Sequence, residues 1–324
     1  MRATQISLTP TGITSSVWND LSVKKDAASL ESGPREQRIE SGGAPPGEII
    51  ADMGEDTIAV RALHLPVFEY ARGRILAHFV LTLRNQMGVL EELSSVLTRS
   101  KVNILSGFHV APLGSDGTWS FFADLTDATL PPDELAKEFS RSPNVLDVKF
   151  RVSRMGFIAD MFHFPPRFVG PILVISASSM KEMFRHIREI LGTSSVGDIL
   201  IHQMGIANGR GIGQSIASVF GKRPGKEELE EFFHLLRAAG WGVETLKEFD
   251  YETSSARVQV ANCTECSFYN QASKPQSQFV RGSYEAQFTS VFGKPVEVEE
   301  VLCTAKGDSL CEFVVKPRQA QSNV

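Results

Sequence analysis

Four cysteines are gathered within one part of this 324-residue chain. Cys263 and Cys266 form a CxxC pair, whereas Cys303 and Cys311 flank a segment that contains a Gly-Asp turn. This turn folds the second pair back across a short hairpin, so its two sulfur atoms can approach one point. Zinc prefers four nitrogen, sulfur or oxygen ligands at tetrahedral angles, and thiolates suit it well. We therefore expect the cysteines to hold a structural zinc ion.

Two other interpretations of the cysteines stay open. They form two disulfides in an oxidising compartment, or they remain free thiols that are buried as small apolar side chains. Residues 1–16 contain no apolar core of a signal peptide, so we expect a cytoplasmic protein with reduced thiols. A reducing compartment favours metal binding over disulfides.

Other residue types show no catalytic pattern. The seven histidines are scattered, and none is paired with another at metal-ligand spacing. No Ser–His–Asp or Cys–His order is present, and the segment Gly209-Arg-Gly-Ile-Gly213 lacks both the G-x-G-x-x-G pattern and a preceding strand. Gly205 and Gly209 stand four residues apart on a predicted helix, which instead favours close approach of a second helix. We expect no intrinsic catalysis.

The composition limits the classes of partner. The net charge is -5, with 42% apolar and 22% charged residues, as in an ordinary globular protein. Because no basic surface is indicated, we expect no nucleic acid binding by the bulk of the chain. No apolar run approaches the roughly 20 residues that a membrane helix needs, so we expect no membrane partner.

The chain is long enough for two domains with their own cores. Residues 1–60 are rich in Ser, Gly, Pro and charged residues, so we expect a disordered tail there. Residues 74–153 carry alternating apolar positions around Phe79 and at 101–110, 119–125 and 144–152, which predict four strands. Helical spacing follows Gly88 and Pro131, so the order is βαββαβ, the ferredoxin-like arrangement.

The turn that contains Asn85 and Gly88, followed by Asn103-Ile104 at the start of the second strand, resembles an ACT domain over residues 76–152. That family binds amino acids, so the resemblance implies an amino-acid ligand held at Asn85, Gly88 and Asn103. The family usually has Asp at the position of Asn85. Free N–H groups at a helix start independently favour an anion. The alternative is that Gly88 only permits a tight turn and the domain only dimerises; an exposed sheet face or edge predicts a homodimer.

Residues 153–170 are too apolar for a free linker, so we expect the side chains of this segment to be buried against a neighbouring domain. These side chains are Met155, Phe157, Met161, Phe162 and Phe164. Pro165-Pro166 marks the boundary.

Residues 160–317 have the pattern of an α+β domain with helices on an antiparallel sheet. We expect a strand at 172–176, helices at about 195–220, 227–239 and 279–292, and hairpins at 241–260 and 296–315. An apolar pocket between helices and sheet, with Phe232 and Trp241 as ligand-binding residues, would suit an apolar or aromatic compound. Met183, Phe184 and Phe233 complete its expected walls.

Glu300 before Cys303, the spacing to Cys311, and the segment from Gly282 to Gly293 are similar to the 4-vinyl reductase-type domain. That family includes bacterial aromatic-sensor domains and a protein of bacteriochlorophyll synthesis, and its fold resembles TRAPP subunits. The resemblance implies metal ligands at Glu300, Cys303 and Cys311, and a cysteine at the position of Ser277.

Since Ser277 is not a cysteine, Cys263 or Cys266 is expected to substitute for that ligand. In a regular strand Glu300 and Cys303 would face opposite sides. Either the strand breaks, or Glu300 is no ligand and all four thiols are.

These observations together predict a cytoplasmic small-molecule sensor with a structural zinc site. Two alternatives stay open. One is a tetrapyrrole-related vinyl reductase or its accessory protein, which the family's name implies. The other is a TRAPP-like assembly or tethering module with a protein partner.

Overall fold

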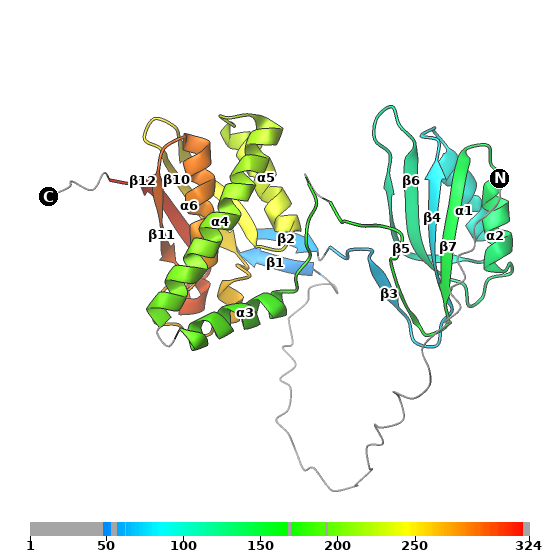
Figure 1. The fold of residues 1–324 in the computed structure, drawn as a ribbon, viewed down its shortest axis with the longest axis horizontal. Helices are drawn as coiled ribbons and strands as arrows, with labels where there is room; N and C mark the ends of the chain where they lie inside the picture. Colours follow the sequence, from blue (N-terminus) through cyan, green and yellow to red (C-terminus); the bar gives the residue numbers. More distant parts are fainter. Residues whose placement is uncertain (1–47, 53–56, 62, 168–169, 192–193, 320–324) are drawn as a thin grey trace, which may run out of the picture. The chain divides into compact units, whose positions relative to one another are not determined.

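The computed structural model describes residues 48–52, 57–61, 63–167, 170–191 and 194–319. The described residues divide into two compact units, the first formed by residues 64–164 and the second by the residues from 165 onward together with a short hairpin at 48–61 (Figure 1). The hairpin pairs β1 (Glu48–Asp52) with β2 (Thr57–Arg61). The expected disordered tail lies largely outside the described residues, and its last part forms this hairpin instead.

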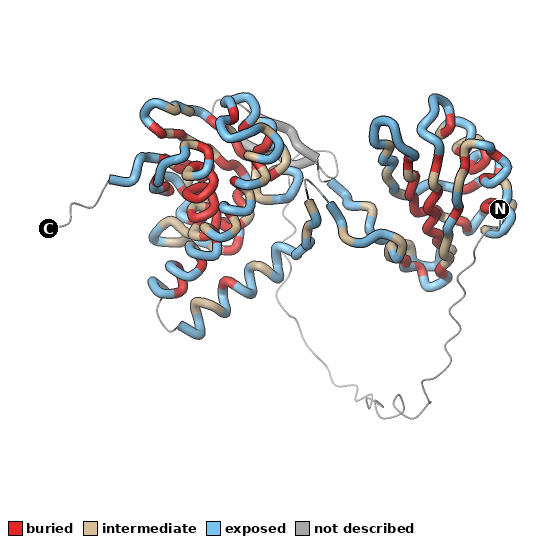
Figure 2. The backbone as a smooth tube through the Cα atoms, turned by 45° about the horizontal axis from the view of Figure 1, so that its top comes forward, coloured by how far each residue is buried: buried red, intermediate tan, exposed pale blue. Residues whose placement is uncertain are grey.

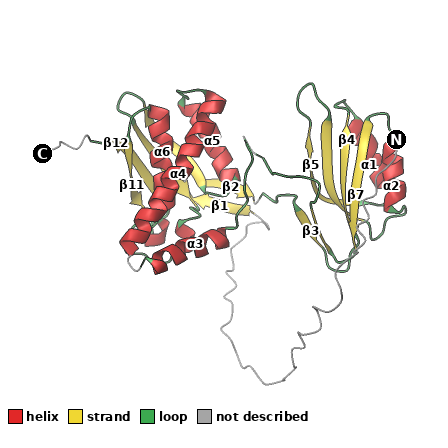
Figure 3. Cartoon of the chain, in the orientation of Figure 1, coloured by secondary structure: helices red, strands yellow, loops and turns green. Residues whose placement is uncertain are grey.

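The first unit confirms the βαββαβ order. Its four-stranded antiparallel sheet has the order β5-β6-β4-β7, which is the ferredoxin-like topology. Helices α1 and α2 cover one face of this sheet (Figure 3). The elements are β4 (Leu76–Leu83), α1 (Val89–Arg99), β5 (Asn103–Val110), β6 (Gly117–Asp124), α2 (Pro132–Ser140) and β7 (Val145–Ser153).

Alternation along the central strand β4 assigns its side chains to two faces. Phe79 and Leu81 pack under the helices with Phe121 and Phe139 in the main core of this unit. His78 points to the opposite face, where it stacks on Phe122. That second face is partly covered by a short antiparallel ladder of β3 (Phe68–Tyr70) and β8 (Phe157–Ala159).

The apolar segment after β7 corrects one expectation. Met155 is 79% exposed and Phe164 is 93% exposed, and Phe157 and Met161 are also exposed. The fully buried side chain here is Ile158, which packs on Leu76 and Phe122 within the first unit. The segment was expected to be buried against a neighbouring domain because its composition is apolar. The β3–β8 ladder instead alternates its side chains and turns Phe157 outward.

The second unit confirms the α+β class with helices on an antiparallel sheet. Its sheet has the order β11-β12-β10-β9. The strands are β9 (Val243–Asp250), β10 (Ser255–Ala261), β11 (Val296–Leu302) and β12 (Cys311–Pro317). The helices are α3 (Ala177–Ile190), α4 (Ser194–Phe220), α5 (Lys226–Ala238) and α6 (Gln278–Phe292), with short 3-10 turns η1 (Cys266–Phe268) and η2 (Thr304–Lys306).

The strand expected at 172–176 is wrong. These residues pair with no strand in the described part of the chain, and Leu173 is 82% exposed. An apolar run forms a strand only when a neighbouring strand supplies hydrogen bonds, and the four strands of this unit's sheet pair with one another instead.

Helix α6 lies at the centre of the second unit, and Figure 2 shows it as a largely buried helix beside α4. The expected close approach of two helices at the glycines is confirmed. A Cβ added to Gly205 would lie 2.1 Å from the carbonyl oxygen of Phe279, and one added to Gly209 would lie 2.1 Å from that of Ser283. From the other side, Gly282 approaches the carbonyl oxygen of His202. The two backbones therefore pack together without intervening side chains.

None of the helices in the described ranges is both long enough and apolar enough to cross a membrane.

Candidate functional site

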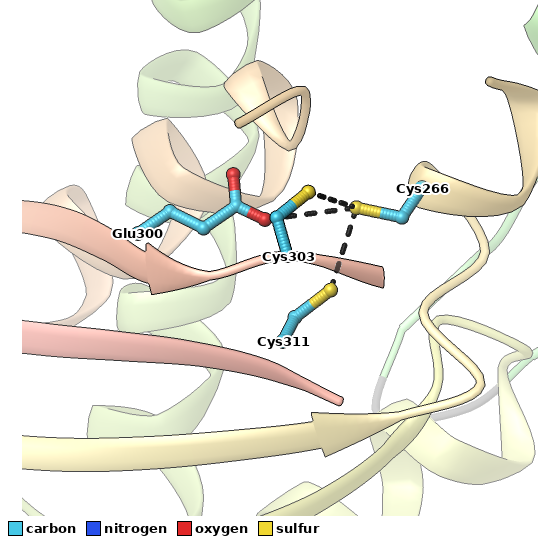
Figure 4. A group of neighbouring side chains, drawn as sticks. All are labelled: Cys266, Glu300, Cys303 and Cys311. Carbon is cyan, nitrogen blue, oxygen red and sulfur yellow. Dashed lines mark hydrogen bonds between the residues drawn. The ribbon is translucent and has the colours of Figure 1, made fainter. Parts of the chain in front are cut away.

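Three thiols and one carboxylate converge where the β11–β12 hairpin meets the loop that follows β10. The ligand atoms of Cys266, Glu300, Cys303 and Cys311 all lie within 4.8 Å of one another, and all four residues are buried. Cys266 Sγ lies 3.4 Å from Cys303 Sγ, 3.4 Å from Cys311 Sγ and 3.6 Å from Glu300 Oε1 (Figure 4). Sulfur ligands about 2.3 Å from a tetrahedral zinc ion are roughly 3.8 Å apart, so this spacing suits a metal ion.

A break in β11 brings Glu300 and Cys303 to the same side. The register of β11 against β12 shifts between Glu300 and Leu302, and Cys303 follows the strand as the residue before η2. A β-bulge reverses the side-chain alternation after it. The backbone N–H of Cys303 donates to Asp308 Oδ2 at 2.7 Å, which anchors the turn of the hairpin. Of the two expectations for this strand, the structure shows the break.

Ser277 lies at the edge of the cluster and is fully buried. Its Oγ is 2.8 Å from Cys266 Sγ and donates to Glu300 Oε1 at 2.9 Å, and its N–H donates to Glu300 Oε2 at 3.0 Å. These bonds hold the Glu300 carboxylate toward the thiols. Cys266 thus occupies the space next to the position at which the resemblance implied a cysteine.

Cys263 lies at the margin of the cluster. It is buried, and its Sγ is 3.7 Å from Ser277 Oγ. Hydrogen bonding to Cys266 raises the pKa of Cys263 well above its ordinary value, and burial adds to this. The residue contacts the cluster without belonging to the group of four, so the structure separates the two cysteines of the CxxC pair.

Glu265, between these cysteines, has a role that the sequence interpretation missed. Its carboxylate accepts hydrogen bonds from the N–H groups of Phe279 at 3.0 Å and Val280 at 2.9 Å, at the start of α6. Burial raises its pKa to about 8. An acidic residue that precedes a helix by a loop is a recognised signal for N-terminal capping only when it is adjacent in sequence, so the spacing gave no indication.

The thiols are protonated in the absence of a cation. Hydrogen bonding to Cys266, together with burial, raises the pKa of Cys303 to about 12, and hydrogen bonding to Cys263 raises that of Cys311 further. A divalent cation removes such protons when it binds, because it stabilises the thiolate. The donor set of three sulfurs and one carboxylate oxygen fits zinc, and it leaves no ligand position for a substrate.

A small cavity lies between α4, α6 and the sheet of the same unit. Its volume is about 20 Å³, room for about one water molecule. Trp241 and Phe279 form a stacked aromatic wall, with ring centroids 5.2 Å apart and an interplanar angle of 9°. Aliphatic side chains and Tyr284 complete the apolar part. The polar residues that line it are Asn208, Glu244, Ser283 and Gln287.

Two polar atoms in this lining lack a partner. Gln287 Nε2 donates to Ser283 Oγ at 2.9 Å, but no group in the described ranges hydrogen-bonds to Gln287 Oε1 or to Glu244 Oε2. Burial raises the pKa of Glu244 to about 8. A protonated Glu244 offers both a donor and an acceptor to a molecule in the cavity.

The other predicted ligand-binding residues lie apart from this cavity. Phe232 is buried in the main core of the unit. In the first unit Asn85, Gly88 and Asn103 are exposed. Gly88 has φ 85°, the left-handed region that favours glycine, and α1 starts there with no side-chain cap.

Residues 256–317 match the family model of the 4-vinyl reductase domain. They comprise β10, α6 and the β11–β12 hairpin, and they contain all four residues of the metal cluster. The search among curated proteins found no match. The match to the family model supports the family resemblance for this region of the chain.

Solved structures show similarity of fold. The phenol-responsive sensory domain of the transcription activator PoxR, determined with phenol, has 15% identity, covers 45% of this chain and 77% of its own, and has a TM-score of 0.41. A vinyl-4-reductase family protein from Methanocaldococcus jannaschii has 16% identity, covers 46% and 100%, and has a TM-score of 0.27.

The first unit has a similar counterpart. The ACT domain of a GTP pyrophosphokinase from Chlorobium tepidum has 14% identity, covers 24% of this chain and 96% of its own, and has a TM-score of 0.21. This level of similarity leaves the ACT resemblance a prediction. None of the structural matches carries an argument about ligands or activity.

Proposed function

We propose that this protein is a cytoplasmic small-molecule sensor whose second unit binds a neutral aromatic compound with one hydrogen-bonding group. The observation that carries the proposal is the cavity of that unit, where stacked aromatic rings lie beside two buried polar atoms without partners in the described part of the chain. Pockets for small molecules combine apolar walls with a few polar groups that orient the ligand. We assign no catalysis to this site.

The chemistry of the lining selects the ligand class. Trp241 and Phe279 present aromatic surface, which favours an aromatic ring. Glu244 is protonated at neutral pH because its pKa is raised to about 8, so it repels neither a hydroxyl nor a carbonyl group. A carboxylate ligand is disfavoured, because its charge would be buried without a cationic partner in the lining.

The size of the cavity couples binding to a change of conformation. Its volume of about 20 Å³ is smaller than an aromatic ring requires, so the lining must move apart when a ligand enters. The liganded state then differs in packing from the unliganded state. A ligand that binds one of two states better shifts the population toward it, which is the property that a sensor needs.

We assign a structural zinc ion to Cys266, Glu300, Cys303 and Cys311, and propose that it supports the cavity wall. The loop that carries Cys266 holds two parts of this wall. Thr264 N–H donates to the carbonyl oxygen of Trp241 at 3.0 Å, and Glu265 accepts from Phe279 and Val280. Fixing this loop by a metal ion therefore fixes the aromatic wall.

A thermal-shift and equilibrium-binding series tests the sensor proposal. The probes are phenol, toluene, which lacks the hydroxyl group, and benzoate, which is charged. We expect phenol to stabilise the protein most and benzoate least. Glu244→Met should weaken phenol binding by about tenfold, because a buried hydrogen bond is lost, whereas Glu244→Gln should retain it.

The matched control is Glu248→Gln, on the same strand but exposed, which should bind phenol like the wild type. Trp241→Ala should reduce binding of both phenol and toluene. A protein that none of the three probes stabilises, or equal phenol affinities of the wild type, Glu244→Met and Trp241→Ala, would contradict the proposal.

For the first unit we propose an amino-acid site at Asn85, Gly88 and Asn103, and a homodimer formed through its sheet. The uncapped N–H groups at the start of α1 support the first part, since they favour a carboxylate. Titration with the amino acids, followed by Asn85→Ala, tests the site. Analytical ultracentrifugation tests the dimer, and its output is proposed to pass to a protein partner.

A further inference from the structure

Two histidines and one aspartate that are far apart in the sequence come together in the first unit. His78 lies on β4, and Asp160 and His163 follow β8. One ligand atom from each of the three lies within 4.8 Å of the others. The sequence interpretation found no histidine pair at ligand spacing, and it missed this one because the pairing depends on the strand β8 returning to the sheet.

The ring of His78 is held in a defined orientation. Its side chain is 0% exposed and stacks on Phe122, with ring centroids 4.2 Å apart and an interplanar angle of 15°. Nε2 is hydrogen-bonded to Ser120 Oγ at 2.9 Å. A neutral imidazole that donates from Nε2 presents its lone pair at Nδ1.

That Nδ1 atom is buried and has no hydrogen-bond partner within the part of the chain that the structure describes. It faces Asp160, whose Oδ1 is 3.8 Å away, which is too long for a hydrogen bond. A buried nitrogen left without a partner costs about 1–3 kcal/mol, so such an atom in a folded protein calls for an explanation.

Asp160 and His163 form a compact turn opposite this nitrogen. Asp160 Oδ1 accepts from the N–H groups of Phe162 at 2.7 Å and His163 at 3.2 Å, and His163 Nδ1 lies 2.6 Å from Asp160 Oδ2. The side chain of His163 is 32% exposed. The cluster is therefore closed by the sheet on one side and reachable from solvent on the other.

We propose that His78, Asp160 and His163 form a binding site for a divalent transition-metal ion of the zinc, cobalt and nickel class, separate from the thiol cluster. Two imidazoles and one carboxylate are a donor set that such ions accept, with the remaining positions taken by water. Nitrogen and oxygen ligands about 2.1 Å from a tetrahedral ion are roughly 3.4 Å apart, close to the 3.8 Å between His78 and Asp160.

The surroundings suit a bound cation. Burial lowers the pKa of His78 to about 4, so the ring is neutral and able to coordinate at neutral pH. Arg151, opposite His78 in the sheet, opposes a cation, and the carboxylate of Asp160 offsets this charge. Ser120 supplies the hydrogen bond to the non-coordinating nitrogen that metal-binding histidines characteristically have.

The ion would connect the segment after β8 to the central strand of the sheet. Asp160 and His163 are among the last residues of the first unit, which ends at Phe164. Binding would exchange the Asp160–His163 hydrogen bond for two bonds to the metal and thereby hold this exit segment against β4. The site is independent of the proposed sensor cavity, which belongs to the second unit.

Cobalt titration of the untagged full-length chain tests the site. Co²⁺ bound by imidazole and carboxylate absorbs in the visible range without the sulfur-to-metal charge transfer of a thiolate site. We expect Asp160→Asn and His163→Ala each to bind one equivalent fewer than the wild type and to lose the absorption that lacks charge transfer. His163 is partly exposed, so its replacement should leave the fold intact.

Two controls separate this site from the others. His186→Ala removes an exposed histidine on α3 and should bind Co²⁺ like the wild type. Cys303→Ser should lose the charge-transfer absorption and keep the equivalent assigned to His78. Asp160→Asn and His163→Ala with the stoichiometry and spectrum of the wild type would overturn the proposal.

Discussion

The Sγ of Cys266 lies 2.8 Å from the Oγ of Ser277, and both atoms adjoin the same carboxylate, that of Glu300. The family resemblance places a metal-binding cysteine at the position of Ser277. In this chain, a thiol from a different loop reaches the same space. The cluster thus keeps three sulfurs and one carboxylate although one ligand comes from elsewhere in the sequence.

This relationship predicts that the two positions are exchangeable. Cys266→Ser should lose zinc, because one of four ligands is replaced by a hydroxyl group. Adding Ser277→Cys to that variant should restore zinc binding, since the new Sγ starts beside Glu300 and close to the site of the lost thiol. Elemental analysis of the purified variants measures this. A double variant as metal-free as Cys266→Ser would show that the positions are not equivalent.

The two thiols at the margin and centre of the cluster should differ in effect. Cys303→Ser should lower zinc content and reduce the melting temperature by several degrees, as about 1 kcal/mol shifts it by roughly 2–4 °C in a domain of this size. Cys263→Ser should retain zinc, since Cys263 lies outside the group of four. Equal loss in both variants would favour four thiolate ligands, and Glu300→Gln then would retain zinc.

The contact between α4 and α6 depends on glycine at particular positions. Gly209→Ala should destabilise the protein by about 1–3 kcal/mol, because its Cβ would lie 2.1 Å from the carbonyl oxygen of Ser283 and the helices would have to separate. Gly211→Ala is the matched control on the same helix, where a Cβ meets nothing within 4 Å. It should be neutral or stabilising by roughly 0.5–1 kcal/mol. Chemical denaturation compares the two, and similar effects would contradict the close-packing argument.

Glu244 should make stability depend on pH. Its folded pKa is raised from 4.5 to about 8, so folding favours the protonated form. Its contribution is therefore fully present below pH 4.5 and is lost as the pH rises toward 8, by up to about 1.4 kcal/mol for each pKa unit. Glu244→Gln stays neutral and should gain stability relative to the wild type between about pH 5 and about pH 8.

Melting temperatures of the two proteins across that range measure the effect. Glu248→Gln, exposed on the same strand, serves as the control and should show a pH-independent difference from the wild type. A constant difference between Glu244→Gln and the wild type at all pH values would mean that Glu244 is already ionised when folded.

Much of the fold is predictable from the sequence because it rests on local periodicity. Alternating apolar residues around Phe79 and helical spacing after Gly88 predict the βαββαβ unit, since period and turn residues specify the elements in order. The spacing of Gly205 and Gly209 predicts close helix packing, because residues four apart share one helix face. The Cys303–Cys311 hairpin is predictable for the same local reason, as a turn brings its own ends together.

Tertiary structure decided which distant groups meet. The bulge after Glu300 turns Cys303 to the same side, and strand alternation alone predicts the opposite. Cys266 rather than Cys263 enters the group of four, and His163 returns to His78, because loops and the β3–β8 ladder place them. Each of these outcomes depends on register and loop path across long sequence separations. Periodicity carries no information about them, whereas packing of the whole unit selects one arrangement.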